Sequence, residues 1–495
     1  MAKRSTMRGR DYIGNLGLDE KDPRSGGRTY HDLDEVIASP LAEWKRPWWV
    51  GWVDEPTMEV DWKGMERFDA TKIQQVSWKR YVGEEKARKL NKEREEKFKQ
   101  WILDNKPGYT LRERALDISY GQSGSVPVTF LGTWASTISE TKEEGDFYTR
   151  DVTTSRLHDP ARPRPLSPEE LGVPRYEGPP EENSRMIRAA LRHFGASQVG
   201  FVELDERHRK LIYAVDALDG KRLEFEPVDR AYETAEKRVI PERARWVIVF
   251  SIQMSEELIK RRSGLAPTAF SSSASGSAYG RARNIMDRLQ TFLHVLGYQG
   301  LMGMWFNGLG IAPALGIMAG LGEMSRLNRM ISPEYGPLQR IFKIVTDLPL
   351  APTRPIDAGI MRFCKTCKVC AEKCPVGTLS LETEPFWEPV GPWNNPGHRT
   401  WYENSVACRT WWSISTTGCS TCFAVCPFSK KDKSFMHKII KATISKNPVM
   451  TGAVNSFITK MDGVFGYQKQ RDLEAWWRLN MPPHGVNDVK KTLLE

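Results

Sequence analysis

The stretch Cys364-Lys-Thr-Cys367-Lys-Val-Cys370-Ala-Glu-Lys-Cys374-Pro375 spaces three cysteines by two residues each and places a fourth before a proline. A second stretch, Cys419-Ser-Thr-Cys422-Phe-Ala-Val-Cys426-Pro427, repeats that ending, and Cys408 precedes it. These are all 8 cysteines of the 495-residue chain. Their confinement to one short region predicts a metal-binding unit built as a pair.

The spacing is that of a protein carrying two [4Fe–4S] clusters. Three closely spaced thiolates can bind three irons of one cube, so the fourth ligand must come from further along the chain. In such pairs the cysteine before the proline binds the other cluster. We therefore predict two ligand sets: Cys364, Cys367, Cys370 and Cys426 for cluster 1, and Cys374, Cys408, Cys419 and Cys422 for cluster 2.

Two other uses of cysteine were weighed against this interpretation. Four thiolates in paired C-x2-C elements can bind zinc, but zinc does not require a run of three cysteines followed by C-x3-C-P. Disulfides are typical of small secreted domains, whereas these cysteines occupy one region of a large chain. The pattern favours iron–sulfur clusters.

Composition is that of a folded protein with room for several domains, with 40% hydrophobic and 27% charged residues. The net charge is +10, but basic residues are interleaved with acidic ones, so no nucleic-acid-binding surface is indicated. Residues 84–100 contain Glu/Lys pairs at i,i+4 spacing and are expected to form a solvated helix. The 17 tryptophans serve either as core packing or as the wall of an apolar pocket.

Alternating helix and strand signals begin after a proline-rich stretch. Asn183 or Ser184 is expected to cap a helix that ends at Gly195, and strands are expected at 199–204, 246–251 and 340–345. Residues 271–279 are rich in serine and alanine and are expected to form a loop, with Tyr279 near the start of the next helix. Residues 301–322 lack charge, but their glycines favour a buried loop around a large ligand over a membrane span.

Several segments together resemble the corrinoid-dependent reductive dehalogenases, most strongly between residues 180 and 430. They are Leu296-Gly-Tyr298, Ala319-Gly-Leu-Gly-Glu323, Ile331-Ser-Pro-Glu-Tyr-Gly-Pro337, Thr346-Asp-Leu-Pro349 and Phe363-Cys-Lys-Thr-Cys367. The resemblance implies an α+β fold: a nitroreductase-like corrinoid-binding core fused to a ferredoxin-like domain with two [4Fe–4S] clusters, preceded by a Trp-rich extension. The implied cofactors are these clusters and a base-off cobalamin or related corrinoid, without a cobalt-ligating D-x-H-x-x-G motif.

The corresponding division of the chain has five parts. Residues 1–150 form the Trp-rich region that covers the core, and 151–182 form a proline-rich connection. Residues 183–355 form the corrinoid-binding domain and 356–430 the two-cluster domain. Residues 431–495 are expected to be helical and to pack on the core.

The resemblance also implies site residues. Tyr279 matches the family's proton donor, Arg340 its cationic partner, and Asn307 an asparagine that orients the phenol or the halide. An adjacent cation favours the ionised form of a phenol, which eases proton donation. We expect the corrinoid to contact Gly308, Gly310 and Ser277, and Trp412, Trp48 and Trp49 to line the substrate pocket.

The implied reaction is reductive removal of halide from an organohalide, in the terminal step of organohalide respiration. Expected partners are a small organohalide, a low-potential electron donor and a small integral-membrane anchor, with no nucleic acid. We expect a peripheral protein on the outer face of the cytoplasmic membrane, exported by the twin-arginine route if the precursor has a leader. The residues around Arg8 and Arg10 are not a functional signal.

Two alternatives stay open. One is a corrinoid iron–sulfur enzyme that resembles epoxyqueuosine reductase and acts on tRNA. The other is an electron-transfer protein that lacks a working corrinoid site. Bound corrinoid and a tRNA-binding assay with a salt titration would separate the three.

Overall fold

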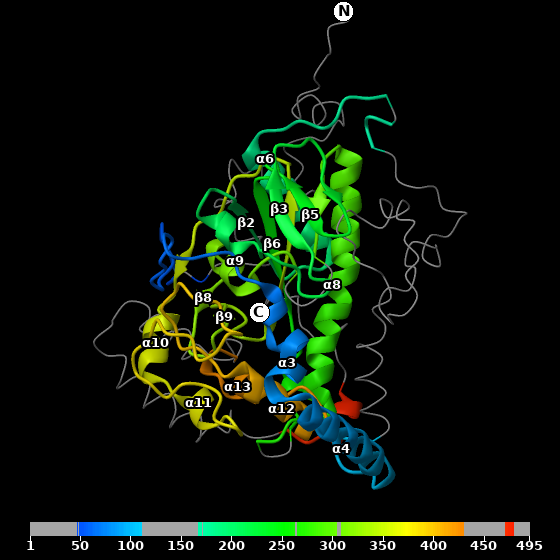
Figure 1. Ribbon diagram of the computed structural model, residues 1–495, viewed down its shortest axis with the longest axis vertical. Helices are drawn as coiled ribbons and strands as arrows, with labels where there is room; N and C mark the ends of the chain where they lie inside the picture. Colours follow the sequence, from blue (N-terminus) through cyan, green and yellow to red (C-terminus); the bar gives the residue numbers. More distant parts are fainter. Residues whose placement is uncertain are drawn as a thin grey trace, which may run out of the picture.

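A four-stranded antiparallel sheet forms the centre of the computed structural model (Figure 1). The structure describes residues 47, 49–110, 167–170, 172–262, 265–303, 308–429 and 471–479. The strand order is β2 (Gln198–Glu203), β6 (Trp246–Gln253), β10 (Gln339–Thr346) and β7 (Gly300–Leu301). The predicted strands at 199–204, 246–251 and 340–345 are therefore confirmed. The apolar run in β6 is central, paired with β2 on one side and β10 on the other.

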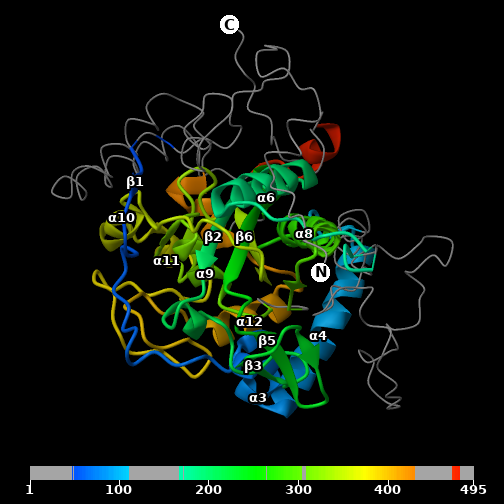
Figure 2. The same cartoon turned by 90° about the horizontal axis from the view of Figure 1, so that it is seen from above.

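Helices cover both faces of this sheet (Figure 2). Phe342 of β10 packs against Tyr279 of α8 (Ala269–Leu296), whereas Ile341 lies next to Gly316 of α9 (Ala312–Met318). Because successive strand residues point to opposite faces, α8 and α9 lie on opposite sides of β10. Helix α6 (Pro180–Phe194) packs on β2 and α8.

The cysteine motifs and the first described helices lie at one end of this core (Figure 1). The helices there are α3 (Gln74–Val82), α4 (Glu84–Leu103), α10 (Ile360–Thr366), α11 (Val369–Glu372), α12 (Ser405–Ile414) and α13 (Thr421–Val425). Helix α12 packs on both α3 and α4, and α11 packs on α13. The predicted solvated helix at 84–100 is confirmed as α4.

Shorter elements complete the described part. A second sheet has the order β3 (Arg222–Glu226), β5 (Lys237–Pro241) and β4 (Tyr232–Glu233). Two-stranded pairs join β1 (Gly51–Trp52) to β11 (Ile356–Asp357) and β8 (Glu323–Met324) to β9 (Met330–Ile331). Helix α7 (Glu256–Ile259) packs on α8 and α13, and the 3-10 turns are 70–72, 208–211, 427–429 and 474–478.

Two expectations about helices are wrong. Helix α6 begins at Pro180 rather than at Asn183 or Ser184, and both of these side chains are buried inside the helix. Pro180 lies in the first turn, where its missing N–H has no helical partner to lose. The predicted end at Gly195 is confirmed, since Gly195 takes the left-handed conformation with φ 107°.

The predicted loop at 271–279 is also wrong. These residues belong to α8, so Tyr279 lies well inside a helix and not near its start. Serine and glycine have weaker helix propensity than alanine. Tertiary burial overrides that preference here, because Ala269, Phe270, Ala274 and Ala278 are fully buried.

Residues 301–303 and 308–322 are mostly buried, as predicted, but α9 replaces part of the expected loop. Leu309 there has a left-handed φ of 64°. Among the described residues, no helix has the length and apolar character needed to cross a membrane. In the predicted C-terminal segment, residues 471–479 are described, and Trp476 packs on Phe270 with ring centroids 5.2 Å apart.

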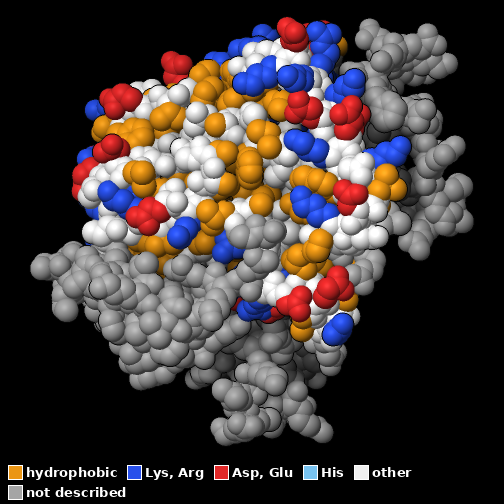
Figure 3. All heavy atoms as spheres, turned by 90° about the horizontal axis from the view of Figure 1, so that it is seen from below, with side chains coloured by type: hydrophobic (Ala, Val, Ile, Leu, Met, Phe, Trp, Pro, Cys, Tyr) orange, Lys and Arg blue, Asp and Glu red, His pale blue; other side chains and the backbone are white. Residues whose placement is uncertain are grey.

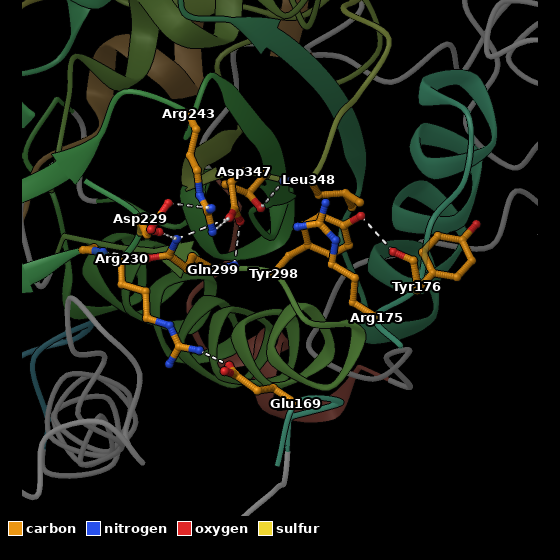
Figure 4. A network of polar contacts seen from close by, with 12 residues as sticks. Glu169, Arg175, Tyr176, Asp229, Arg230, Arg243, Tyr298, Gln299, Asp347 and Leu348 are labelled. Atoms are coloured by element: carbon orange, nitrogen blue, oxygen red, sulfur yellow. Dashed lines mark hydrogen bonds and ion pairs between the residues drawn. The ribbon is translucent and has the colours of Figure 1, made fainter. Parts of the chain in front are cut away.

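A polar network fixes the end of β10 that lies away from the cysteines (Figure 4). Asp347 is buried and accepts hydrogen bonds from the Gln299 backbone N–H at 2.7 Å and from Arg243 Nη2 at 3.1 Å. The Tyr298 hydroxyl donates to the Tyr176 carbonyl at 2.8 Å. These hydrogen bonds hold Tyr298 and Gln299, which follow α8, against the end of β10 and against the chain before α6.

Candidate active site between a tyrosine helix and two cysteine motifs

The eight cysteines lie on short helices and the turns that follow them. Cys364 is on α10, Cys370 on α11, Cys408 on α12 and Cys422 on α13. Cys367 and Cys426 directly follow α10 and α13. All eight are free thiols. Since α11 packs on α13, the two motifs face each other.

The structure brings the thiols together in two groups. Cys370 interacts electrostatically with Cys364, Cys367 and Cys426. Cys419 interacts with Cys374, and Cys408 interacts with both of them. Cys422 interacts with Cys419 and Cys408, and also with Cys370 of the other group. The two groups have the same members as the sets predicted from spacing, and Cys422 interacts with both Cys370 and Cys426 of the other group. Which cysteines bind each cluster stays a prediction.

Burial raises the pKa of six of the thiols, those of Cys364, Cys370, Cys408, Cys419, Cys422 and Cys426. It raises the pKa of Cys364 to about 12 and the pKa of Cys370 well above its ordinary value, with neighbouring cysteines acting in the same direction. Cluster ligands must be thiolates, so cluster binding has to displace the thiol protons. The Cys374 sulfur accepts a hydrogen bond from the Thr378 N–H at 3.4 Å and lies 3.3 Å from the Thr378 hydroxyl.

One cavity joins the cysteine motifs to the core. Its wall includes all four thiols of the second group, Cys374, Cys408, Cys419 and Cys422, and none of the first. Tyr279 and Arg340 line the same cavity. A cluster held by the second group would therefore deliver electrons at the wall of the cavity that Tyr279 and Arg340 line.

Tyr279 and Arg340 approach each other from α8 and β10. The Arg340 Cζ lies 5.7 Å from the Tyr279 ring centroid, and Phe342 packs edge-on against that ring at 5.6 Å. Arg340 Nη2 donates to Ser275 Oγ at 2.7 Å, one helical turn before Tyr279. The Tyr279 side chain is 43% exposed, toward the cavity that it lines.

The Arg340 side chain is half-buried, and its Nε atom is fully buried. Burial lowers its pKa below the ordinary value, while Tyr279 and Cys422 act in the opposite direction. A guanidinium keeps its proton in proteins even so. Arg340 therefore places a permanent positive charge next to the Tyr279 ring and the second cysteine group.

Of the other predicted site residues, some line the cavity and others do not. Trp412 lines the cavity, whereas Trp49 is buried and is not part of the wall. Gly308, Gly310 and Ser277 are also not part of the wall, although residues 311–314 next to the two glycines are. Asn307 and Trp48 lie outside the described residues.

Much of the wall was not predicted from the sequence. Its apolar part comes from chain segments far apart, namely Met58, Trp62, Met65, Phe68, Tyr213, Met318 and Met324. Trp62 belongs to the Trp-rich N-terminal region, so composition gave a weak indication of this role. His398 also lines the cavity, and burial lowers its pKa to about 4.

The cavity fits a large ligand that is apolar with a polar rim. Gln339 Oε1, Asn395 Oδ1 and Trp412 Nε1 are buried in its wall with no hydrogen-bond partner among the described residues. Buried polar atoms are normally satisfied, so these three indicate a bound group that supplies acceptors and donors. A corrin, with an apolar macrocycle and amide side chains at its edge, has this character.

The first turn of α8 is bonded directly to the second cysteine motif. Ser271 Oγ donates to the Gly418 carbonyl at 3.0 Å, the residue before Cys419. Thr421, beside Cys422, donates from its hydroxyl to the Leu265 carbonyl at 3.0 Å. The helix that carries Tyr279 is thereby anchored to a cluster ligand loop.

Comparison with known proteins identifies the protein family to which this arrangement of residues belongs. The family model described as "Reductive dehalogenase subunit" matches residues 45–350, and the model of a 4Fe-4S double cluster binding domain matches residues 363–429. Together they span the cavity wall and both cysteine motifs. The second match excludes the zinc alternative for the cysteines.

Individual relatives agree with these matches. The chain is 29% identical over 536 residues to a chloroethene reductive dehalogenase of Dehalococcoides mccartyi strain VS, covering 97% of this chain and 98% of that protein. A trichloroethene reductive dehalogenase of Dehalococcoides mccartyi strain ATCC BAA-2266 is 30% identical, over 63% of this chain and 60% of that one. An epoxyqueuosine reductase of Bacillus subtilis is 26% identical over 24% of this chain.

Solved structures share the fold. A catabolic reductive dehalogenase superposes with a TM-score of 0.59 at 19% identity, covering 92% of this chain and 53% of that one. Another reductive dehalogenase, whose structure is described as suggesting a mechanism for B12-dependent dehalogenation, gives 0.58 at 20% identity. This chain spans about half the length of those proteins.

The fold and site are those of a corrinoid iron–sulfur oxidoreductase. More narrowly, the chain belongs to the reductive dehalogenase family, whose substrates are organohalides and whose cofactors are a corrinoid and two [4Fe–4S] clusters.

Proposed function

We propose that this protein removes halide reductively from a small apolar organohalide, as the terminal reductase of organohalide respiration. The balanced reaction is R–X + 2 e⁻ + H⁺ → R–H + X⁻. The observation that carries the proposal is the single cavity whose wall holds the second cysteine group, Tyr279 and Arg340. Electron delivery and proton delivery thus meet in one space.

The bound corrinoid supplies the reductive cleavage of the carbon–halogen bond. Gln339, Asn395 and Trp412 would hold its polar edge, since their buried polar atoms belong to the cavity wall and have no partner among the described residues. The apolar wall around Met58 and Phe68 excludes water and accepts a hydrophobic substrate. The contacts of Gly308, Gly310 and Ser277 with the corrinoid remain predictions, as does the five-part division of the chain.

Tyr279 donates the proton from its hydroxyl to the carbon that loses halide. Arg340 stabilises the phenolate left behind, because its cation lies 5.7 Å from the tyrosine ring. The hydrogen bond from Arg340 to Ser275 holds that cation on the same helix face as Tyr279. Asn307 stays a predicted partner of the phenol or the halide.

Electrons enter at cluster 1 from a low-potential donor. The thiols assigned to cluster 1 are not part of the cavity wall, and the chain after Cys374 exposes the hydrophobic residues Leu381, Trp387 and Val390. Figure 3 views the molecule from the end that carries the cysteine motifs and shows hydrophobic side chains gathered between charged ones. This end suits docking of the donor or of an integral-membrane anchor. The outer-face location and export by the twin-arginine route belong to the same proposal.

The test is an anaerobic assay of the corrinoid-loaded protein with a low-potential donor, in which free halide is measured over a panel of chlorinated ethenes, ethanes and aromatics. Tyr279→Phe should lower turnover by about 10²–10⁴-fold at unchanged corrinoid and iron content, since it removes the proton donor. Tyr213→Phe is the matched control, because it removes a hydroxyl from another cavity tyrosine. Parental turnover by Tyr279→Phe would refute the assignment.

A further inference from the structure

A fully buried arginine lies against the ligand loop of cluster 1. Arg326, in the connection between β8 and β9, has 0% exposure. It forms no ion pair within the described part of the chain, and its hydrogen-bond acceptors there are backbone carbonyls. A buried charge is normally paired, so this guanidinium needs a counter-charge.

The carbonyl acceptors belong to the cluster 1 loop and to the chain beside it. Arg326 Nε lies 3.0 Å from the Cys364 carbonyl and 3.1 Å from the Cys367 carbonyl. Nη2 donates to the carbonyls of Cys364 at 2.6 Å and Lys365 at 3.2 Å. Nη1 donates to Ser380 at 2.8 Å and Glu382 at 2.6 Å. The planar fork of one arginine thus spans two chain segments.

The surrounding structure fixes this guanidinium. The Trp401 ring stacks on it, with the Arg326 Cζ 4.6 Å from the ring centroid, and Trp401 Nε1 donates to the same Glu382 carbonyl at 3.0 Å. Ser325 Oγ bridges the turn by donating to the Arg329 carbonyl at 2.7 Å. Arg326 therefore has little freedom to turn toward another partner.

The cysteines of cluster 1 are the main source of negative charge that acts on Arg326. Arg326 interacts electrostatically with Cys364, Cys370 and Cys367, which all belong to the first set, and less strongly with the exposed carboxylate of Glu372. Four thiolates outweigh the positive charge of the iron–sulfide core, and reduction adds one further negative charge. A fixed cation next to the cluster favours the reduced form and raises the reduction potential.

We propose that Arg326 is a positioning residue and the counter-ion of cluster 1. Its hydrogen bonds fix the Cys364–Cys367 loop, and its positive charge raises the reduction potential of the cluster. The inference rests on the cluster assignment and not on the substrate or the proton donor. Its role is distinct from that of Arg329 in the same turn, which pairs with Glu403 and reaches Cys408 and Cys422 of cluster 2.

The experiment is a redox titration of the intact protein followed by electron paramagnetic resonance, with the two clusters resolved. Arg326→Gln keeps some hydrogen bonds but removes the charge. We expect the reduced-to-oxidised ratio of cluster 1 at a fixed potential to fall about tenfold, which for one electron is a 59 mV lower midpoint. The ratio for cluster 2 should stay within about twofold, because Arg326 does not reach its ligands.

Two further variants separate charge from hydrogen bonding. Arg326→Lys keeps the charge but loses the fork, so cluster 1 should keep its midpoint and lose iron to a chelator several-fold faster than the parent. Arg329→Gln should lower the midpoint of cluster 2 and leave that of cluster 1 unchanged. Neither readout requires substrate turnover, so failure of the proposed dehalogenation would not affect them.

The proposal is overturned if Arg326→Gln leaves cluster 1 unchanged or shifts both clusters equally. It is also overturned if Arg326→Lys lowers the cluster 1 midpoint as much as Arg326→Gln does. Should Arg326→Gln fail to retain cluster 1, the lysine variant decides. A parental midpoint then supports the counter-ion role, and a lowered midpoint refutes it.

Discussion

The two cysteine motifs have nearly the same spacing, yet they lie in different surroundings. The thiols of the first set are between 6% and 8% exposed and take no part in the cavity wall, whereas those of the second set line it. In the first set, the backbone carbonyl of Cys364 accepts a hydrogen bond from Arg326. In the second set, the sulfur of Cys374 accepts a hydrogen bond from the Thr378 N–H. The spacing of the cysteines predicts the type of cluster that each motif binds, and tertiary contacts decide which of the two sets lies at the cavity.

The largest effect should come from removing one cysteine ligand from either set. Cys374→Ala removes a thiolate of cluster 2, so we expect loss of about half of the iron and at least a 10³-fold fall in halide release. Iron analysis and the spectrum of the remaining cluster check this prediction. Cys370→Ala is the matched variant and should spare cluster 2. Loss of the cluster bound by Cys364 in Cys374→Ala would reverse the pairing.

A smaller effect is expected at the arginine on the cavity side. Arg340→Gln removes the cation beside Tyr279 and should lower kcat by about 10²-fold without loss of corrinoid or iron. Ser275→Ala keeps the Arg340 cation and removes the hydrogen bond that positions it, together with a weak contact to the Met254 sulfur; a hydrogen bond is worth about 1 kcal/mol, so kcat should fall several-fold. Steady-state kinetics with free-halide detection rank the two. An equal loss in both variants would mean that position, and not charge, is what Arg340 contributes.

The smallest effect concerns the stability of the cavity side as a function of pH. Burial lowers the pKa of His398 to about 4 in the folded protein. Between that value and the ordinary pKa of about 6.5, the unfolded chain binds a proton that the folded chain does not, so stability falls as pH falls. From pH 7 to pH 5 the loss should be about 2 kcal/mol, measured by denaturant unfolding of the cofactor-free protein.

His398→Gln should remove most of that pH dependence. His193→Gln is the control, because His193 is exposed on α6 and its replacement should leave the slope unchanged. An unchanged slope in His398→Gln would place the pH dependence elsewhere.

Local patterns predicted the parts of the fold that depend on neighbours in sequence. The cysteine spacing, the apolar run of β6 and the charge pairs of α4 all carry their signal within a few turns or one strand. The segment 271–279 misled because its serines and glycine favour loops, while packing on the sheet and on Trp476 makes it helical. Propensity is weak where burial is strong.

The site shows the same division. Tyr279 and Arg340 were found through resemblance, and the structure brings them together across α8 and β10. Met58, Phe68 and His398 carry no local pattern that marks a cavity wall, since only the folded chain places them near each other. The clamp by Arg326 was equally invisible, because a lone arginine in a turn has no sequence signature.

The bond from Ser271 to Gly418 joins the helix of the tyrosine to the loop of a cluster ligand. The serine- and glycine-rich start of α8 has little intrinsic helicity, so burial of its apolar residues and this attachment together keep it helical. A newly made chain awaiting its iron should therefore hold Tyr279 loosely, and metal insertion should tighten it. Cluster insertion would then also complete the active site, because only a chain that holds its clusters would place the Tyr279 hydroxyl in position.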